Sequence, residues 1–191
     1  HVSWLVREPD HSVQELSWTD PRGTGLLREE RTVRARELNE RVWVLDVRVR
    51  LHNTSGTDLS IGSPATNGRP GAGYGGLFWR APLGPTPPEC TGADGLRGEQ
   101  ALHGSRASWL ALSGTTDADR RWTLLFCQPG PHNDPWFLRA EEYPGLGPAL
   151  AWAKRLPLPV GKTVDRTLRT AVCDGHPDRL ESLAEAVLSL G

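Results

Sequence analysis

The alternating segment from Val42 to Leu51 constrains the fold of this 191-residue chain more than any other part of it. Its side chains divide into two series, one wholly apolar and the other mostly charged. The apolar series is Trp43, Leu45, Val47, Val49 and Leu51, and the opposing series is Val42, Val44, Asp46, Arg48 and Arg50. Because successive side chains of a strand point to opposite faces of a sheet, this pattern predicts a strand in an antiparallel sheet that buries one face.

Shorter segments with the same rhythm fill most of the chain, and turn residues separate them. We expect further strands at residues 2–6, 13–18, 26–35, 59–61, 77–80, 107–112, 122–127, 136–140, 149–153 and 164–172. Helical spacing of apolar residues occurs only after His176, in the stripe of Leu180, Leu183, Ala184, Val187 and Leu188. The sequence therefore predicts an all-β fold, an antiparallel β-sandwich with one short C-terminal helix.

The chain shows no linker and no internal repeat, so we expect a single β-sandwich domain over residues 1–191. Residues 81–104 contain prolines and glycines but few apolar side chains, which predicts a long surface loop. The chain lacks methionine and enters a strand pattern within its first five residues. We therefore expect a fragment of a longer protein, truncated at the N-terminus.

Charge and cysteine usage exclude several classes of partner. The 22 basic and 23 acidic residues nearly balance, so no overall field attracts nucleic acid or an anionic membrane surface. No apolar run approaches the roughly 20 residues that a membrane span needs. Three widely spaced cysteines without a CxxC pair indicate reduced thiols rather than disulfides or a thiolate zinc site. We expect a soluble, cytoplasmic protein that binds neither nucleic acid nor membrane and holds no metal or cofactor.

The segment from Gly62 to Pro82, GSPATNGRPGAGYGGLFWRAP, combines dense glycines with an aromatic pair and an arginine. Its GxGxxG-like match is not a phosphate loop, because a strand pattern and Pro82 follow where a helix should begin. Two interpretations stay open: a glycine-rich sheet corner with Trp79 in the core, or a surface that faces a ligand. The polar tips of Asn67, Tyr74 and Arg80 favour the second, because such groups are costly to bury without partners.

A second group of candidate residues runs from Pro131 to Gly145. Within it a strand at 136–140 would be flanked by His132 and Asn133 on one side and by Glu141, Glu142 and Tyr143 on the other. An imidazole near a carboxylate can transfer protons, and an aromatic ring beside arginine can bind a sugar-like ligand. The alternative is a capped turn followed by a surface ion pair of Arg139 with either glutamate.

These patterns lead to one proposed set of site residues, to which Arg106 is added from the segment His103-Gly104-Ser105-Arg106. The candidate catalytic residues are His132, Glu141 and Glu142. The candidate ligand-binding residues are Asn67, Tyr74, Trp79, Arg80, Arg106, Asn133, Trp136, Arg139 and Tyr143. A GxSxG elbow is absent, so nothing indicates a serine nucleophile. The residues fix no reaction, and both binding and catalysis stay open.

Four stretches, in this order, carry a resemblance to a known family. They are NGRPGAGYGGLFWRAP at 67–82, HGSRASWLAL at 103–112, PWFLRAEEYPG at 135–145 and LRTAVCDG at 168–175. Together they resemble the PmoA-like family in its actinobacterial type, soluble bacterial proteins often labelled "methane oxygenase PmoA" or "domain of unknown function". The likeness covers nearly the whole chain and corresponds to the C-terminal two thirds of a family member.

The resemblance implies a β-supersandwich similar to the galactose-mutarotase-like folds, which bind or process carbohydrates, and an association with sugar oxidoreductases. The family motifs fall on Gly75, Gly76, Phe78, Arg80, Gly104, Arg106, His132, Asn133, Trp136, Arg139 and Tyr143. Methane oxidation is not expected, because the membrane-embedded monooxygenase subunit needs spanning helices that this sequence lacks.

Two functions from different classes follow. The first is binding or processing of a small carbohydrate-like ligand in a pocket on the concave face of a sheet, where Arg80, Arg106, His132, Trp136 and Arg139 converge. The second is a non-catalytic interaction domain that uses its eight tryptophans to pack against a partner such as a sugar oxidoreductase. Convergence of the polar residues would favour the first function, and their dispersal would favour the second.

Overall fold

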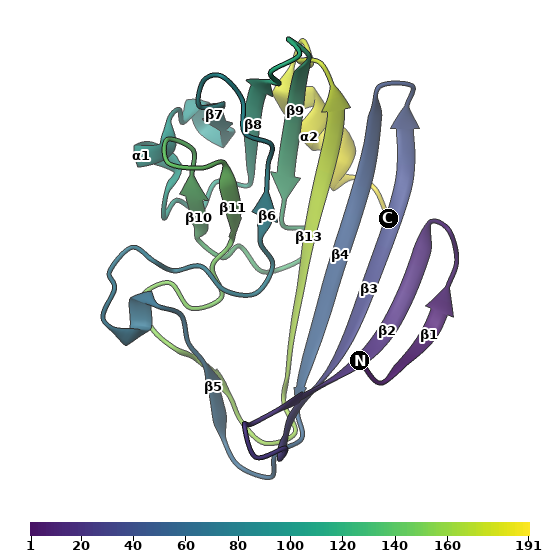
Figure 1. Ribbon diagram of the computed structural model, residues 1–191, viewed down its shortest axis with the longest axis vertical. Coiled ribbons are helices and arrows are strands. Elements are labelled where there is room, and N and C mark those ends of the chain that lie inside the picture. The colour runs from purple at the N-terminus through teal and green to yellow at the C-terminus, as the bar shows by residue number, and fades with distance from the viewer.

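The computed structural model describes residues 1–191 and is built around one eight-stranded antiparallel sheet (Figure 1). The strands of this main sheet, from one edge to the other, are β1 (Ser3–Arg7), β2 (His11–Thr19), β3 (Gly25–Asn39), β4 (Val42–Asn53), β13 (Thr163–Asp174), β9 (Arg121–Cys127), β8 (Trp109–Thr115) and β7 (Glu89–Gly92). The predicted strand at 42–51 is β4, which lies near the middle of the sheet. The all-β prediction is confirmed.

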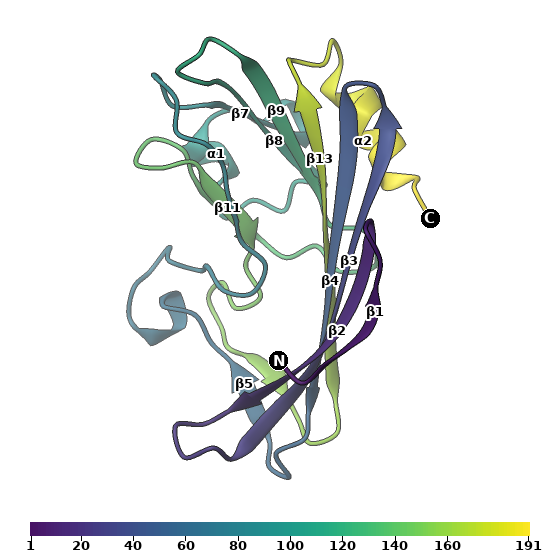
Figure 2. The ribbon, with the colours of Figure 1, turned by 45° about the vertical axis from the view of Figure 1, so that its right-hand side comes forward.

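A second, smaller layer covers part of one face of the main sheet, which we call the inner face (Figure 2). Its strands are β10 (Trp136–Arg139), β11 (Gly145–Pro148) and β6 (Trp79–Arg80). Trp79 packs edge-on against Phe126 of β9, with ring centroids 5.9 Å apart. A core cluster of 24 buried residues joins the main sheet to this second layer and to the C-terminal helix on its other face, so the predicted sandwich is confirmed.

The second layer does not extend across the whole inner face. It lies over the β13–β9–β8 half, whereas β1–β3 stand clear of it (Figure 2). Tryptophans that are a little under half exposed lie on the rest of the inner face, among them Trp4 of β1, Trp18 of β2 and Trp43 of β4. At the other end of the strands, β5 (Leu59–Ile61) pairs with β12 (Leu156–Leu158) and closes a small apolar cluster around Leu51.

Two predicted segments differ from the structure. Residues 149–153 form turns rather than a strand, and β11 precedes them in the sequence GLGP. That sequence has little side chain, and Gly147 instead brings its backbone against that of Leu77, where a Cβ would collide. A pattern based on side-chain alternation cannot register such a strand.

Residues 81–104 are not one long loop. They contain β7, the 3₁₀ turn η2 (Ala93–Gly95) and the one-turn helix α1 (Glu99–Leu102), and another 3₁₀ turn, η1 (Ala65–Asn67), precedes them. Buried Cys90 and Leu102 anchor the segment to the core. Two apolar anchors among many prolines and glycines gave too weak a sequence signal for these short elements.

All three cysteines are free and buried. Burial disfavours the charged thiolate and raises the pKa of Cys90 and Cys127 to about 12 and that of Cys173 to about 11. In the folded protein these thiols are therefore core side chains with little reactivity.

The C-terminal helix α2 (Leu180–Leu188) packs on the opposite, outer face of the main sheet through Ala184 and Val187. Buried Arg169 of β13 links the helix α2 to the main sheet. Its Nη1 donates to the carbonyl oxygens of Val187 (2.8 Å) and Leu190 (2.7 Å), and its Nε donates to Asp46 of β4 (2.5 Å). A guanidinium at the end of the helix satisfies carbonyls that have no partner within it. No helix is both long and apolar enough to cross a membrane.

We expect Asp46→Ala to lower the free energy of unfolding by about 3 to 5 kcal/mol, because it leaves the buried guanidinium of Arg169 without its counter-charge. Asp165→Ala is the matched control, since Asp165 forms a solvent-exposed ion pair with Arg48 on the same sheet. Its loss should cost about 1 kcal/mol or less. Urea unfolding followed by circular dichroism measures both values, and equal losses would contradict this account.

Candidate functional site

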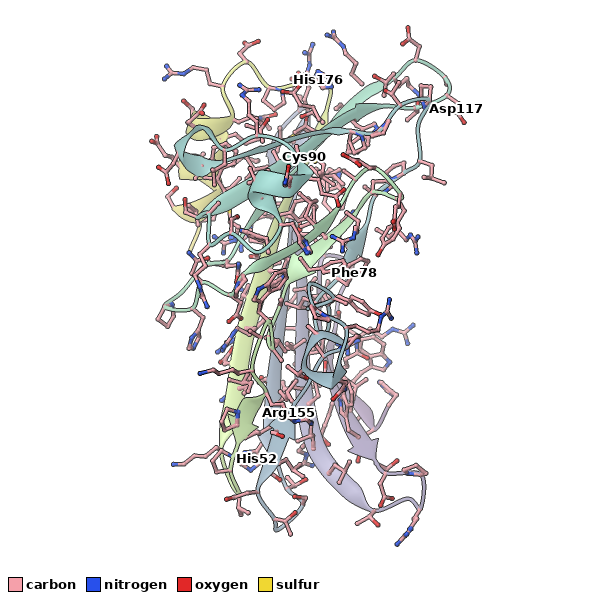
Figure 3. All side chains as sticks on the ribbon, turned by 90° about the vertical axis from the view of Figure 1, so that its left-hand side faces the viewer. His52, Phe78, Cys90, Asp117, Arg155 and His176 are labelled. Carbon is pink, nitrogen blue, oxygen red and sulfur yellow. The ribbon has the colours of Figure 1, made fainter.

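A hollow of about 280 Å³ lies where the end of the glycine-rich segment faces the inner face of the main sheet. Its floor comes from β2, β3 and β4, and its far wall comes from the segment around Phe78. The lining residues are Trp18, Glu29, Arg31, Val47, Val49, Leu51, Gly76, Leu77, Phe78 and Leu150. Figure 3 shows Phe78 at mid-height, where the second layer meets the loops below it. We call this site the inner hollow.

One buried carboxylate organises the polar side of the inner hollow. Glu29 is only 1% exposed, and each of its oxygens accepts one hydrogen bond. The indole N–H of Trp18 donates to Oε2 (2.7 Å), and Nε of Arg31 donates to Oε1 (2.6 Å). Such charge-assisted bonds fix the orientation of both donors. Glu29 therefore sets the position of an indole ring and of a guanidinium at once.

The rest of the lining is apolar, and two rings remain open to solvent. Trp18 is 49% exposed and Phe78 is 42% exposed, although the chain has a substantial core in which large apolar rings could be buried. Val47 and Val49 of β4 add apolar side chains to the floor of the hollow. Exposed rings beside a fixed guanidinium form a surface that suits a small ligand with one flat apolar side and several oxygens.

The glycine-rich segment that forms the far wall is held in place by His103. Nε2 of His103 lies 2.9 Å from the carbonyl oxygen of Gly71, and Nδ1 accepts the backbone N–H of Leu138 in β10 (3.2 Å). This pattern places the ring proton on Nε2, which donates to Gly71. The ring also stacks edge-on against Phe137 and Trp152. His103 is thus a positioning residue that ties the segment to the second layer.

The glycines of this region allow the tryptophan ring of Trp152 to approach the backbone. A Cβ on Gly104 would lie 2.7 Å from Cζ2 of Trp152, and Gly104 has φ +83°, a conformation that side chains disfavour. Gly73 lies against the same ring. The glycines of this region therefore allow close packing against Trp152, in addition to lying near the hollow.

Gly104→Ala should lower the free energy of unfolding by about 2 to 4 kcal/mol, from backbone strain together with the collision with Trp152. Gly95→Ala isolates the strain, because Gly95 has φ +73° but no atom within 4 Å of the added methyl group. It should cost only about 1 kcal/mol. Denaturant titration compares the two variants, and a Gly104→Ala loss no larger than that of Gly95→Ala would refute the packing role.

Burial, and secondarily the positive charge of Arg139, lowers the pKa of His103 below its ordinary value. Arg139 Nη1 lies 3.1 Å from Nδ1 of His103, and the same nitrogen lies 3.4 Å from Oε1 of Glu99. His103 is therefore neutral at neutral pH, in agreement with its acceptor role at Nδ1.

The shift makes stability depend on pH. The unfolded chain protonates His103 near its ordinary pKa of about 6.5, whereas the folded protein does so only at lower pH, so the stabilisation is complete above about pH 6.5 and is lost as pH falls through the folded pKa. His103→Gln should flatten the decline in unfolding free energy between about pH 6.5 and 5. His132→Gln, which removes an imidazole from an exposed position, is the control for the loss of a histidine as such. Urea titrations across the range test this, and identical slopes for His103→Gln and the unaltered protein would contradict it.

The structure brings together some, but not all, of the polar residues that the sequence predicted as one site. The guanidinium of Arg80 stacks on Tyr143 at 4.4 Å, at the edge of the second layer. Arg106 bonds to the carbonyl oxygen of Asn133, and the Asn133 side chain donates to the carbonyl oxygen of Arg106 (2.7 Å). Arg139 stacks on Phe137 instead. Arg80 and Arg139 both lie opposite Gly145 of β11, one on each neighbouring strand, whereas Arg106 pairs with Asn133, so only part of the expected convergence is present.

The predicted proton-transfer residues are not brought together either. His132 precedes β10 and lines a hollow beside β13, whereas Glu141 and Glu142 follow β10 and line a shallow depression with Glu99 and Arg139. The strand between them separates the imidazole from both carboxylates. Arg139 pairs with Glu99, so the alternative ion pair with Glu141 or Glu142 is not formed.

The remaining predicted residues divide between core and surface. Trp136 is 0% exposed and donates its indole N–H to the carbonyl oxygen of Ala107 (2.8 Å), so it offers no face to a ligand. Trp79 is half-buried against Phe126. Asn67 lies 3.4 Å from Arg155, and Tyr74 stacks edge-on against Phe137 at 5.1 Å. Neither of these two lines the inner hollow.

The hollow beside β13 is larger, about 400 Å³, but its cations are already paired. Arg48 donates two hydrogen bonds to Asp165, Arg166 pairs with Asp134, and Arg169 with Asp46. No group of three or more His, Cys, Asp and Glu side chains is arranged to hold a metal ion.

Sequence reasoning missed Trp18, Glu29 and Arg31. A signal was present, since Glu29 and Arg31 occupy the same alternating series as Leu27, Val33 and Ala35, so two charges interrupt the apolar face of a predicted strand. Buried charges need partners, which marks such an interruption as a candidate site.

The profile of the family described as "Family of unknown function (DUF6807)" matches residues 1–187. No curated protein and no solved structure matches the chain.

Proposed function

We propose that this chain, which belongs to the family of unknown function DUF6807, binds a carbohydrate or sugar derivative in the inner hollow. The observation that carries the proposal is that one buried carboxylate, Glu29, fixes both an exposed indole ring and a guanidinium on the same apolar floor. Exposed apolar surface rimmed by polar groups is typical of binding sites, and a guanidinium held in a fixed orientation offers donors to a ligand there.

The chemistry of the lining matches that of a sugar. A pyranose ring has apolar C–H patches that stack on aromatic side chains, here Trp18 or Phe78, and oxygens that accept hydrogen bonds from a guanidinium such as that of Arg31. A hollow near the lower end of the size range of ligand pockets, about 300 Å³, suits a ligand of one or two rings. The resemblance to PmoA-like proteins, and through them to galactose-mutarotase-like sandwiches, supports the same ligand class.

Binding is favoured over catalysis. Glu29 is the one carboxylate in the lining, and both of its oxygens accept hydrogen bonds from fixed donors. A general base must come within reach of the proton that it removes, and Glu29 is only 1% exposed. The residues first considered for proton transfer, His132, Glu141 and Glu142, do not line this hollow.

Trp18→Ala and Phe78→Ala should each weaken sugar binding by about threefold to tenfold, the loss expected for one stacked ring. Trp43→Ala is the matched control, because Trp43 is 42% exposed on the same face but does not line the hollow. A thermal-shift screen of monosaccharides and their acids identifies binders, and calorimetry then measures their Kd values. The proposal fails if no sugar raises the melting temperature, or if Trp43→Ala weakens binding as much as Trp18→Ala.

One observation favours a second candidate, a protein-interaction surface for a partner such as an oxidoreductase. Trp4 and Trp43 are exposed on the inner face outside the hollow, which a sugar site alone does not require. Aromatic residues are enriched at interfaces. Under this alternative Trp43→Ala and Trp4→Ala, rather than Phe78→Ala, would weaken association with the partner.

A further inference from the structure

We infer that the ligand of the inner hollow carries a carboxylate, so that the protein prefers a sugar acid to a neutral sugar, and that Arg31 recognises this group. The inference rests on the proposed function and names the ligand class more narrowly. It follows from how Arg31 is held, from which of its nitrogens remain free, and from the charges around it.

Arg31 is fixed at one nitrogen and open at the other two. Its Nε donates to Glu29, and neither terminal nitrogen has an acceptor in the protein. The side chain is 36% exposed and lines the hollow. Glu29 binds Nε at the side of the guanidinium. The end of the group, which carries the two terminal nitrogens, is therefore available to a ligand. That end matches the two oxygens of a carboxylate, which it can bind with parallel hydrogen bonds.

The counter-charge of Arg31 does not occupy the position that the ligand would take. Glu29 lies beneath the surface, with its oxygens accepting from Trp18 and from Nε of Arg31. The other lining residues are uncharged, so no second carboxylate competes for the free end of the guanidinium. Apolar surroundings strengthen the attraction between a guanidinium and an anion relative to water.

The hollow beside β13 shows the contrast. There Arg48 uses both Nε and Nη2 for Asp165, and Arg169 uses all three of its nitrogens for Asp46 and the carbonyls at the end of α2. Those guanidinium groups are committed to the fold. Arg31 lines a hollow with its terminal nitrogens free, and this distinguishes it from the arginines of the larger hollow.

The test compares D-glucuronate with D-glucuronamide, which has nearly the same shape but no charge, and with D-glucose. Calorimetry on the unaltered protein should give a Kd for glucuronate about tenfold to a hundredfold lower than for glucuronamide, the range expected for hydrogen bonds to a charged group. D-galacturonate and D-galactose repeat the comparison with a second ring.

Two variants locate the effect. Arg31→Gln should bring the ratio of the two Kd values close to one, and Arg31→Lys should retain only part of the preference, because lysine keeps the charge but not the paired nitrogens. The ratio within one variant is unaffected by a general loss of stability. Arg34→Gln is the control, because Arg34 is exposed on the same strand but points to the outer face.

The outcomes separate the two proposals. If glucuronamide and glucose bind as tightly as glucuronate, and Trp18→Ala weakens all three, the acid preference is refuted while sugar binding stands. If Arg34→Gln abolishes the preference and Arg31→Gln does not, Arg31 is the wrong residue and the inference fails. If none of the five compounds binds, the proposed function and the acid preference both fall.

Discussion

The register of β3 against β4 is the constraint on which the site depends. It places Glu29 opposite Leu51 and Arg31 opposite Val49, so that both charges lie on the inner face. A shift of one residue would send them to the outer face and replace them with side chains that now point to solvent. Such a shift would also turn Leu27 and Val33 of β3 off the inner face, where Leu27 packs against the apolar cluster around Leu51, and the loss of this packing opposes it.

Much of the fold could be predicted because side-chain alternation reports directly on which face is buried. The C-terminal helix and the second half of the segment at 42–51 have such patterns, but in the first half of β4 the opposing residues Val42, Val44 and Asp46 are buried and Trp43 is exposed. β11 has no such pattern, since close backbone packing at Gly147 takes the place of side chains there. The site was harder to predict. The charges on the inner face of β3 are visible in the sequence, but the second layer decides which part of that face is open.

The two interpretations of the glycine-rich segment both describe part of it. Trp79 packs into the core, as a sheet corner would require, while its neighbour Phe78 stays exposed at the hollow, as a ligand-facing surface would require. Phe78 directly precedes the two-residue strand β6, and the alternation of successive side chains from Phe78 to Trp79 produces both results. His103, which sequence alone gave little weight, decides the position of the whole segment through its bonds to Gly71 and Leu138.

The floor and the far wall of the inner hollow come from separate parts of the chain. The floor belongs to hairpins that end at residue 53, and the wall belongs to loops around Phe78 and Leu150. Changes in those loops can reshape the apolar side of the cavity while the strand pairing that aims the guanidinium stays intact. Under the proposed function, proteins built on this plan can therefore diversify in the ring they accept and still share one anchoring charge.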